Sequence, residues 1–241
     1  MDYRISQIGV IHSCYKEKFG VPRQPGLAPL AEGVIELSQE YAEAEAVRGL
    51  EQFSHIWVIF LFHQTLNSLW KPTVRPPRLG GNQRMGVFAS RSPFRPNHLG
   101  LSVVALQHVE ASAGRVCLHV NGLDLVDGTP VVDIKPYLPY VDAIPEAVGG
   151  YADQSPGKVL RVEFSSLAQQ QCQSASEQYP QLEKLIEQVL VLDPRPAYSE
   201  GGDTERVYGM KLYEFDVKWV VRDDMVHVLS LGYPPLQAAP T

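Results

Sequence analysis

The chain has 241 residues and a formal net charge of −6 at pH 7, and 44% of its residues are hydrophobic. This composition is ordinary for a globular protein of one large or two modest domains with a real hydrophobic core. It contains no apolar run of about 18 residues and no signal-like N-terminus, so we expect a cytoplasmic protein without a membrane span. Its three cysteines are too few and too scattered to predict a disulfide framework or a metal knuckle.

The first part of the chain, up to about residue 140, alternates short apolar segments with Pro-rich loops. The segments are rich in β-branched and aromatic residues, and helical periodicity is nearly absent apart from a turn near residues 44–50. This pattern predicts a barrel-like domain of short antiparallel strands, or a sandwich, and not a βαβ array. The predicted strands cover residues 3–12, 33–37, 55–62, 85–89, 101–109, 115–121 and 131–134.

The last part of the chain differs in pattern. Residues 149–157 are mostly small and predict a linker. After it we expect a strand over 159–164, a helix capped by Ser166 that runs toward Gln178, and a helix over 182–192. A half-buried strand from Tyr213 to Trp219 then turns at residues 223–224 into a strand over 226–231. We therefore predict a mainly β domain over residues 1–148 and a small α+β domain over 158–233, which leans on the first domain or on a partner subunit.

Positive charge gathers in one window of the chain. Between Gln52 and Val109 there is no Asp or Glu, and the window has a formal charge of +6, so the remainder carries −12. Such segregation predicts a local site for a polyanion or for a ligand that bears a carboxylate. The six cationic residues are Lys71, Arg75, Arg78, Arg84, Arg91 and Arg95.

Two stiff loops carry cations and hydrogen-bonding groups. The loop GVFASRSPFRPNHLG, residues 86–100, combines Arg91 and Arg95 with Ser92 and Asn97, and Gly100 allows a close backbone approach. The loop YKEKFGVPRQPG, residues 15–26, contains two prolines that restrict its free conformations. Both loops, and the long loop over 72–84, are candidates for function.

Three aspartates gather in the segment DLVDGTPVVDIKPY, residues 124–137. Asp127 with Gly128 and Pro130 is typical of a tight turn. The alternative interpretation is functional: the acidic groups lie near a bound cation. Mg²⁺ could use these aspartates, although no EF-hand or His/carboxylate spacing supports a metal. His63 and Gln64 close an apolar strand, where a histidine is more often structural. No GxSxG turn, GxGxxG or P-loop occurs.

Four segments together resemble a known family: IGVIHSCYKEKFGVPRQPGL, GVFASRSPFRPNHLGLSVV, LDLVDGTPVVDIKPYLPY and DPRPAY. They are similar to the β-barrel tRNA methyltransferases that methylate N6 of threonylcarbamoyladenosine beside the anticodon. The resemblance covers essentially the whole chain. It implies a cytoplasmic, homodimeric enzyme that uses S-adenosylmethionine and no metal, with a barrel-like catalytic domain and a C-terminal domain that helps to engage tRNA.

The resemblance also implies roles for individual residues. Candidate proton acceptors are Asp124 and Asp127, without a secure general base. The cofactor would contact Pro22, Arg23, Gln24, Pro25, His63, Gln64, Arg91, Leu101, Asp124, Leu125, Val126 and Asp127. Candidates for tRNA contact are Lys16, Lys18, Arg75, Arg78, Arg84, Arg95, Asn97 and Arg195. His98 and Cys14 stand where the family usually has proline, and we expect these changes to loosen the two loops slightly.

Two other functions remain open from the residues alone. A non-catalytic RNA-binding module could use the same basic loops to hold an anticodon arm. A phosphate-ester enzyme could place Mg²⁺ on the aspartates. Binding of S-adenosylmethionine distinguishes the first alternative from a methyltransferase, and sensitivity to a chelator distinguishes the second.

Overall fold

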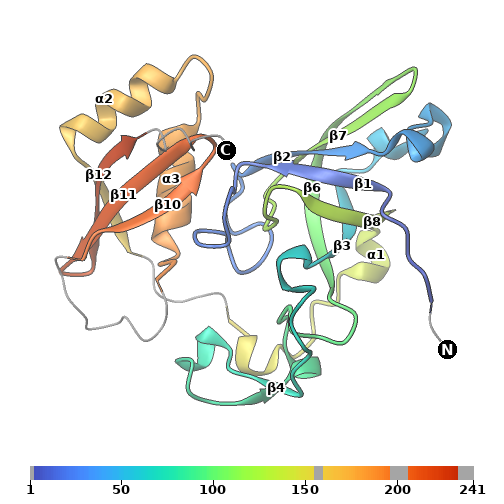
Figure 1. Cartoon of the computed structure of the whole chain (residues 1–241), viewed down its shortest axis with the longest axis horizontal. Coiled ribbons are helices and arrows are strands. Elements are labelled where there is room, and N and C mark those ends of the chain that lie inside the picture. The colour runs from blue at the N-terminus through green and yellow to red at the C-terminus, as the bar shows by residue number, and fades with distance from the viewer. Residues whose placement is uncertain (1–2, 155–159, 196–205, 233–241) are drawn as a thin grey trace, which may run out of the picture.

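The computed structural model describes residues 3–154, 160–195 and 206–232. Its first domain is a closed barrel in which six strands follow the order β1-β2-β7-β6-β3-β8 (Figure 1). All neighbouring strands of the barrel are antiparallel. The mainly β first domain and the α+β second domain confirm the predicted fold class. The barrel strands are β1 (Gly9–Ser13), β2 (Glu32–Leu37), β3 (His55–Leu61), β6 (Leu99–Ser112), β7 (Arg115–Asn121) and β8 (Thr129–Pro136).

The interior of the barrel is filled by every second residue of its strands. On β3, Ile56, Val58 and Phe60 are buried, and on β7 Val116, Leu118 and Val120 are buried, although Cys117 between them is buried as well. Gly100 of β6 faces Phe60 across the strand pair, and a Cβ atom at Gly100 would lie 2.3 Å from the Phe60 ring. Glycine is therefore required there because the ring occupies the space of a side chain.

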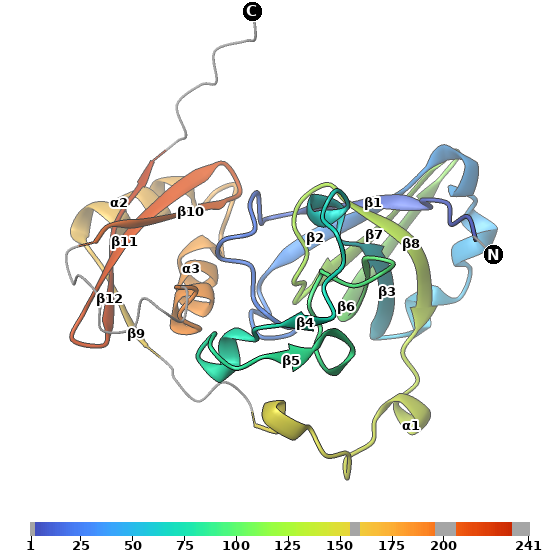
Figure 2. The same cartoon turned by 60° about the horizontal axis from the view of Figure 1, so that its bottom comes forward.

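Two of the predicted first-domain strands are wrong in extent or in place. The strand expected over 3–12 begins only at Gly9, which pairs with the last residue of β2, Leu37. The strand expected over 85–89 is not part of the barrel. Met85 and Gly86 form β5, which pairs with β4 (Thr73–Val74) and is followed by a 3₁₀ turn at Val87–Ala89. Residues 71–86 thus form a separate arm (Figure 2), which we call the basic arm.

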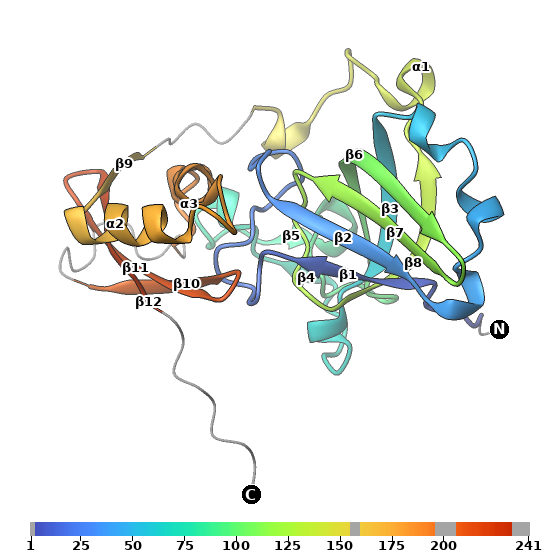
Figure 3. The ribbon, with the colours of Figure 1, turned by 90° about the horizontal axis from the view of Figure 1, so that it is seen from above.

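The second domain is a four-stranded sheet in the order β10-β11-β12-β9, with β9 parallel to β12. Helices α2 and α3 lie on one face of this sheet (Figure 3). The N-cap of α2 is Ser165 and not Ser166, since the Ser165 hydroxyl accepts the Ala168 N–H at 3.1 Å. The elements are β9 (Arg161–Phe164), α2 (Ser166–Ala175), α3 (Leu182–Val191), β10 (Tyr208–Leu212), β11 (Phe215–Arg222) and β12 (Met225–Gly232).

Strand β10 is absent from the sequence-based prediction, and Tyr213 lies in the turn that follows it and not in a strand. Residue 159 of the expected strand, residues 155–157 of the expected linker and residues 196–198 of DPRPAY lie outside the described residues. Short helical turns connect the larger elements. They are Gln39–Tyr41, Ala44–Val47, Leu50–Gln52, η4 (His63–Thr65), Pro77–Leu79, α1 (Pro139–Asp142) and η7 (Gly150–Ala152). Within the described residues, none of the helices has the length and apolar character needed to span a membrane.

Candidate functional site

A cavity of about 1720 Å³ opens beside one end of the barrel. Its walls come from the loop over 18–27, η4, the basic arm, the loop over 88–95, the start of β6, the segment 124–126, η7 and the end of α3. Among the described residues, eight Lys or Arg side chains line it, against two Asp side chains, Asp124 and Asp193. The cavity therefore has a strongly positive lining with one carboxylate on the barrel side, as the charge window predicted.

Arg91 and Asp124 face this cavity from different segments of the first domain. Arg91 follows the 3₁₀ turn at Val87–Ala89, and its guanidinium donates a hydrogen bond to the side-chain oxygen of Gln24. Asp124 follows β7, and its Oδ1 accepts the Ser102 hydroxyl at 2.6 Å. Three segments distant in the sequence thus bring a guanidinium, an amide and a carboxylate to one cavity.

The environment of Asp124 changes its proton affinity. Burial raises the pKa of this carboxyl from 3.8 to about 6, while the hydrogen bond from Ser102 and the charge of Arg91 act in the opposite direction. Burial wins because desolvation penalises the charged form more than these partners stabilise it. Asp124 therefore titrates close to neutral pH, as a group that exchanges protons in a reaction often does.

Asp127 has a different position and different partners. It is not among the residues that line the cavity. Its Oδ1 accepts the Ser13 N–H at 2.8 Å, its Oδ2 pairs with Lys16 Nζ at 2.9 Å, and its own N–H donates to the Tyr15 carbonyl at 2.8 Å. Asp127 and Lys16 thus join two loops, and the carboxylate of Asp127 is already occupied by these partners.

Most of the other expected cofactor residues do line the cavity. They are Pro22, Arg23, Gln24, His63, Gln64, Leu101, Leu125 and Val126, whereas Pro25 lies outside the lining. Burial lowers the pKa of His63, which favours its neutral form. Leu101 is 52% exposed and offers an apolar surface at the start of β6.

The loop after Arg91 is held by its own hydrogen bonds. Arg95 Nη1 donates to the carbonyl of Ser90 at 2.9 Å and to that of Ser92 at 3.3 Å. His98 is buried with a φ of 49°, and its Nδ1 lies 3.0 Å from the Pro93 carbonyl oxygen. Proline cannot adopt this φ, so a proline at this position would need a different backbone conformation. The expected loosening of the loop stays a prediction.

Cys14, the other departure from the family's proline, is also fixed in place. Its side chain is buried, and its carbonyl accepts the Tyr213 N–H at 2.7 Å. Burial raises the pKa of its thiol to about 12, so the thiol is protonated at neutral pH. The Cys14 side chain is thus a packed apolar group.

The expected tRNA contacts divide into two groups. Lys18 and Arg95 line the cavity together with the three exposed arginines of the basic arm, Arg75, Arg78 and Arg84. Lys16, which pairs with Asp127, and the exposed Asn97 lie outside the lining. Arg195 also lies outside it and binds the carboxylate of Asp193 through two 2.7 Å hydrogen bonds. The side chains of Arg195 and Asp193 are only 11% and 12% exposed, so the Arg195 guanidinium faces Asp193 more than solvent.

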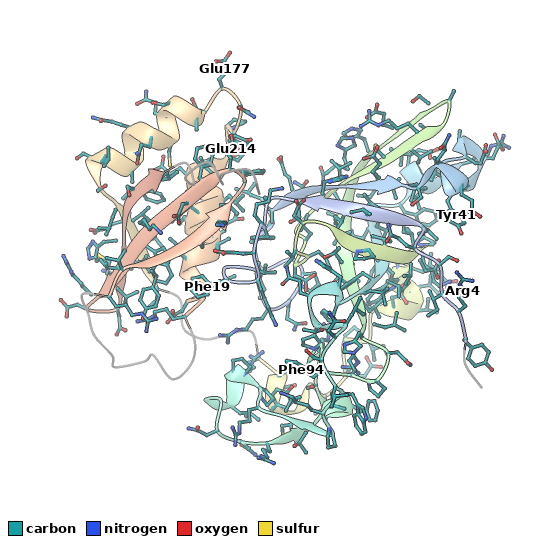
Figure 4. All side chains as sticks on the ribbon, in the orientation of Figure 1. Arg4, Phe19, Tyr41, Phe94, Glu177 and Glu214 are labelled. Atoms are coloured by element: carbon teal, nitrogen blue, oxygen red, sulfur yellow. The ribbon has the colours of Figure 1, made fainter. Side chains whose placement is uncertain are left out.

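Several residues that line the cavity were not predicted from the sequence to have a role in the site. Phe94 lies where the barrel meets the basic arm (Figure 4), with Lys71 Nζ 4.4 Å and Lys18 Nζ 6.0 Å from its ring centroid. Ser102 occurs in an ordinary apolar strand, and Tyr151 occurs in the segment expected to be a linker. No local pattern marks these residues, because only the folding of distant segments onto the cavity gives them a role.

A metal site is not evident in the part of the chain that the structure describes: no three His, Cys, Asp or Glu side chains gather there in a way that could hold an ion.

Comparison with known proteins assigns both parts of the chain to domains of one family. Residues 10–143 match the family model of the tRNA-methyltransferase O N-terminal domain, and residues 157–233 match that of the TrmO C-terminal domain. The tRNA (adenine(37)-N6)-methyltransferase of Escherichia coli is 52% identical over 229 residues, which cover 95% of this chain and 97% of that protein. A protein of Pseudomonas aeruginosa described as a putative S-adenosylmethionine-dependent methyltransferase is 48% identical over 234 residues, or 96% of this chain and 99% of that protein.

The fold is similar as well. The crystal structure of TrmO from Pseudomonas aeruginosa superimposes with a TM-score of 0.81 at 43% sequence identity, covering 96% of this chain and 99% of that one. These matches confirm the resemblance inferred from the four sequence segments. Because the two family models and these relatives together span nearly the whole sequence, the chain belongs to the TrmO family.

Proposed function

We propose that this protein transfers a methyl group from S-adenosylmethionine to N6 of the adenosine at position 37 of tRNA, beside the anticodon. The observation that carries the proposal is the basic cavity in which Arg91 and the buried Asp124 meet. Membership of the TrmO family and the names of its relatives support the same activity. As the resemblance implies, we take the accepted base to carry a threonylcarbamoyl group on N6.

The residues of the cavity fit the cofactor in chemistry and in size. S-adenosylmethionine has a carboxylate, which suits the guanidinium of Arg91, and a sulfonium cation, which suits the acidic segment that contains Asp124. Leu101 offers apolar surface for its adenine. Most small-molecule pockets have volumes of up to roughly 1,000 Å³. At about 1720 Å³ this cavity is larger, so it has room for a second, larger ligand.

When bound, S-adenosylmethionine supplies an electrophilic methyl group. The protein must then orient the exocyclic amine of adenine, which is a poor nucleophile because its lone pair is delocalised. Orientation of this kind can contribute roughly 7–11 kcal/mol. Asp124 is the acceptor that we assign to the amine proton, since it lines the cavity with a pKa of about 6 while Asp127 is engaged by Ser13 and Lys16.

The basic arm provides the contact with RNA in this proposal. Its three arginines are exposed and line the same cavity, and no acidic residue lies between Gln52 and Val109. Phosphate groups of a single-stranded anticodon loop complement such a surface. A homodimer in the cytoplasm, as the resemblance implies, remains part of the proposal.

The decisive experiment combines purified protein, S-adenosylmethionine with a labelled methyl group and tRNA that carries threonylcarbamoyladenosine. We expect label in the base at position 37, and unmodified transcript as control should gain far less. Absence of transfer at saturating cofactor would refute methyl transfer. Calorimetry with S-adenosylmethionine alone separates the enzyme, which should bind it, from a non-catalytic RNA-binding module, which should not.

A further inference from the structure

The loop over residues 14–30 lies between the two domains and contacts both (Figure 1). Near its start, the Cys14 carbonyl accepts the Tyr213 N–H at 2.7 Å, and Tyr15 forms an antiparallel bridge with Leu212. The Glu17 carboxylate then accepts the Lys211 N–H at 2.9 Å. All three contacts reach the end of β10 or the turn after it, so the start of the loop extends the sheet of the second domain.

The far end of the loop is also attached to the second domain. The backbone N–H of Leu30 donates to the side-chain oxygen of Gln188, on α3, at 3.0 Å. Between the two ends, Phe19 projects toward the second domain (Figure 4) and its ring stacks on that of Trp219, with centroids 6.4 Å and planes 8° apart. The second domain thus contacts the loop at its start, in its first third and at its end.

The middle of the same loop faces the cavity. Pro22, Arg23 and Gln24 line it, and Gln24 accepts the hydrogen bond of Arg91. The loop is joined to the first domain as well: the Gly26 N–H donates to the Gly122 carbonyl at 2.7 Å, just before Asp124, and Tyr15 and Lys16 contact Asp127 near the start of the loop. Arg91 is therefore held by a residue whose loop is anchored on the second domain.

We propose that the second domain positions the cofactor-binding loop, with Gln188 and Glu17 as positioning residues that act through Gln24 on Arg91. The inference rests on the proposed function, in which Arg91 and residues 22–24 hold S-adenosylmethionine. A loop of this length loses much conformational entropy when it is ordered. Anchoring both ends on a folded domain removes that cost before the cofactor binds, which raises the affinity of the site.

The same arrangement couples the two domains. We call the loop docked when its contacts with the second domain are formed. If the docked loop binds the cofactor more tightly than the undocked loop, the cofactor must stabilise the docked state by the same factor. An RNA bound to the second domain would then alter cofactor affinity through these contacts. A second domain that merely packed against the barrel would not produce this reciprocity.

The test compares two glutamine variants that remove the same kind of bond. Gln188→Leu removes the acceptor for Leu30 N–H, whereas Gln171→Leu removes an acceptor for Leu231 N–H, at 2.7 Å, entirely within the second domain. By titration calorimetry of the full chain, we expect Gln188→Leu to bind S-adenosylmethionine about 5- to 10-fold more weakly, the loss of one hydrogen bond. Gln171→Leu should bind it as the wild type does. Gln188→Glu, which keeps an acceptor oxygen, should recover most of the affinity.

A second measurement needs no core variant. Hydrogen exchange of the wild-type amides of Lys211 and Tyr213 should slow on addition of S-adenosylmethionine, whereas that of Leu231 should not change. Glu17→Ala, a surface variant, should abolish the slowing at Lys211. Equal cofactor affinity of Gln188→Leu and wild type, or unchanged exchange at Lys211 and Tyr213, would overturn the positioning role alone. A wild type that does not bind S-adenosylmethionine at all would overturn the proposed function and with it this inference.

Discussion

Replacement of Asp124 by Asn tests the proton acceptor most directly. Asn keeps an oxygen for the hydroxyl of Ser102, 2.6 Å away, but it cannot take up a proton. If Asp124 accepts the amine proton, methyl transfer should fall about 10²- to 10⁴-fold, the usual contribution of a positioned acid or base. The wild-type rate should rise with pH up to about 6 and then level off, because only the ionised carboxylate accepts a proton. The Asn variant should lack this rise.

The same substitution should alter stability in the opposite direction. The pKa of Asp124 is about 6 in the folded protein and 3.8 in the unfolded chain. Between these two pH values the folded state therefore holds a proton that the unfolded state has released. Stability contributed by this group is therefore present at low pH and lost as pH rises through about 6. With about 1.4 kcal/mol per pKa unit, the loss is at most about 3 kcal/mol. Asp124→Asn should accordingly be more stable than wild type above pH 6.

Urea unfolding at pH 5 and pH 7 measures this effect. The stability of the Asn variant relative to wild type should increase by about 1 kcal/mol between the two pH values. Asp127→Asn is the matched control, since it loses the ion pair with Lys16, 2.9 Å away, and should cost stability while the rise of activity near pH 6 persists. An Asp124→Asn enzyme that retains activity within threefold, or whose stability advantage does not grow with pH, would refute the reasoning.

Four further outcomes are expected. Arg91→Ala should weaken cofactor binding about 10- to 100-fold by calorimetry, the loss of a charged hydrogen bond, with little change in Tm; a large fall in Tm would make Arg91 structural. Substitution of all three arginines of the basic arm by Gln should reduce the slope of log tRNA affinity against log salt by about 2, at roughly 0.7 per phosphate contact, and leave S-adenosylmethionine affinity unaltered. Gly100→Ala should lower stability by about 1–3 kcal/mol in denaturant unfolding, because its Cβ would lie 2.3 Å from Phe60; a neutral effect would mean that this ring moves aside freely. A chelator should not change methyl transfer, whereas its loss would support Mg²⁺ chemistry on the aspartates.

Barrel strands with clear alternation were predictable from sequence to within a few residues. The residues of β3 alternate between buried and less buried positions, with Ile56, Val58 and Phe60 at the buried ones. Strands β5 and β10 could not be placed in this way. Each is short and contains a glycine, and β5 exists only because β4 pairs with it. Pairing with another segment, and not local preference, forms both strands.

The candidate site shows the same division. Arg91 and the basic arm could be predicted from the sequence, because they lie in a continuous segment that contains cationic residues and no Asp or Glu. The different roles of Asp124 and Asp127 are not visible, since the two residues are three positions apart in one acidic segment. Burial raises the pKa of one, and Ser13 and Lys16 occupy the other.

The sequence by itself determined the alternation that closes a barrel, the acid-free cationic window and the family motifs, because each of these is a local property of consecutive residues. Only the tertiary structure decided which aspartate faces the cavity, that Gly100 makes room for Phe60, and that the second domain anchors the loop of Gln24. These features depend on contacts between residues as much as 194 positions apart, and such contacts exist only once the chain has folded.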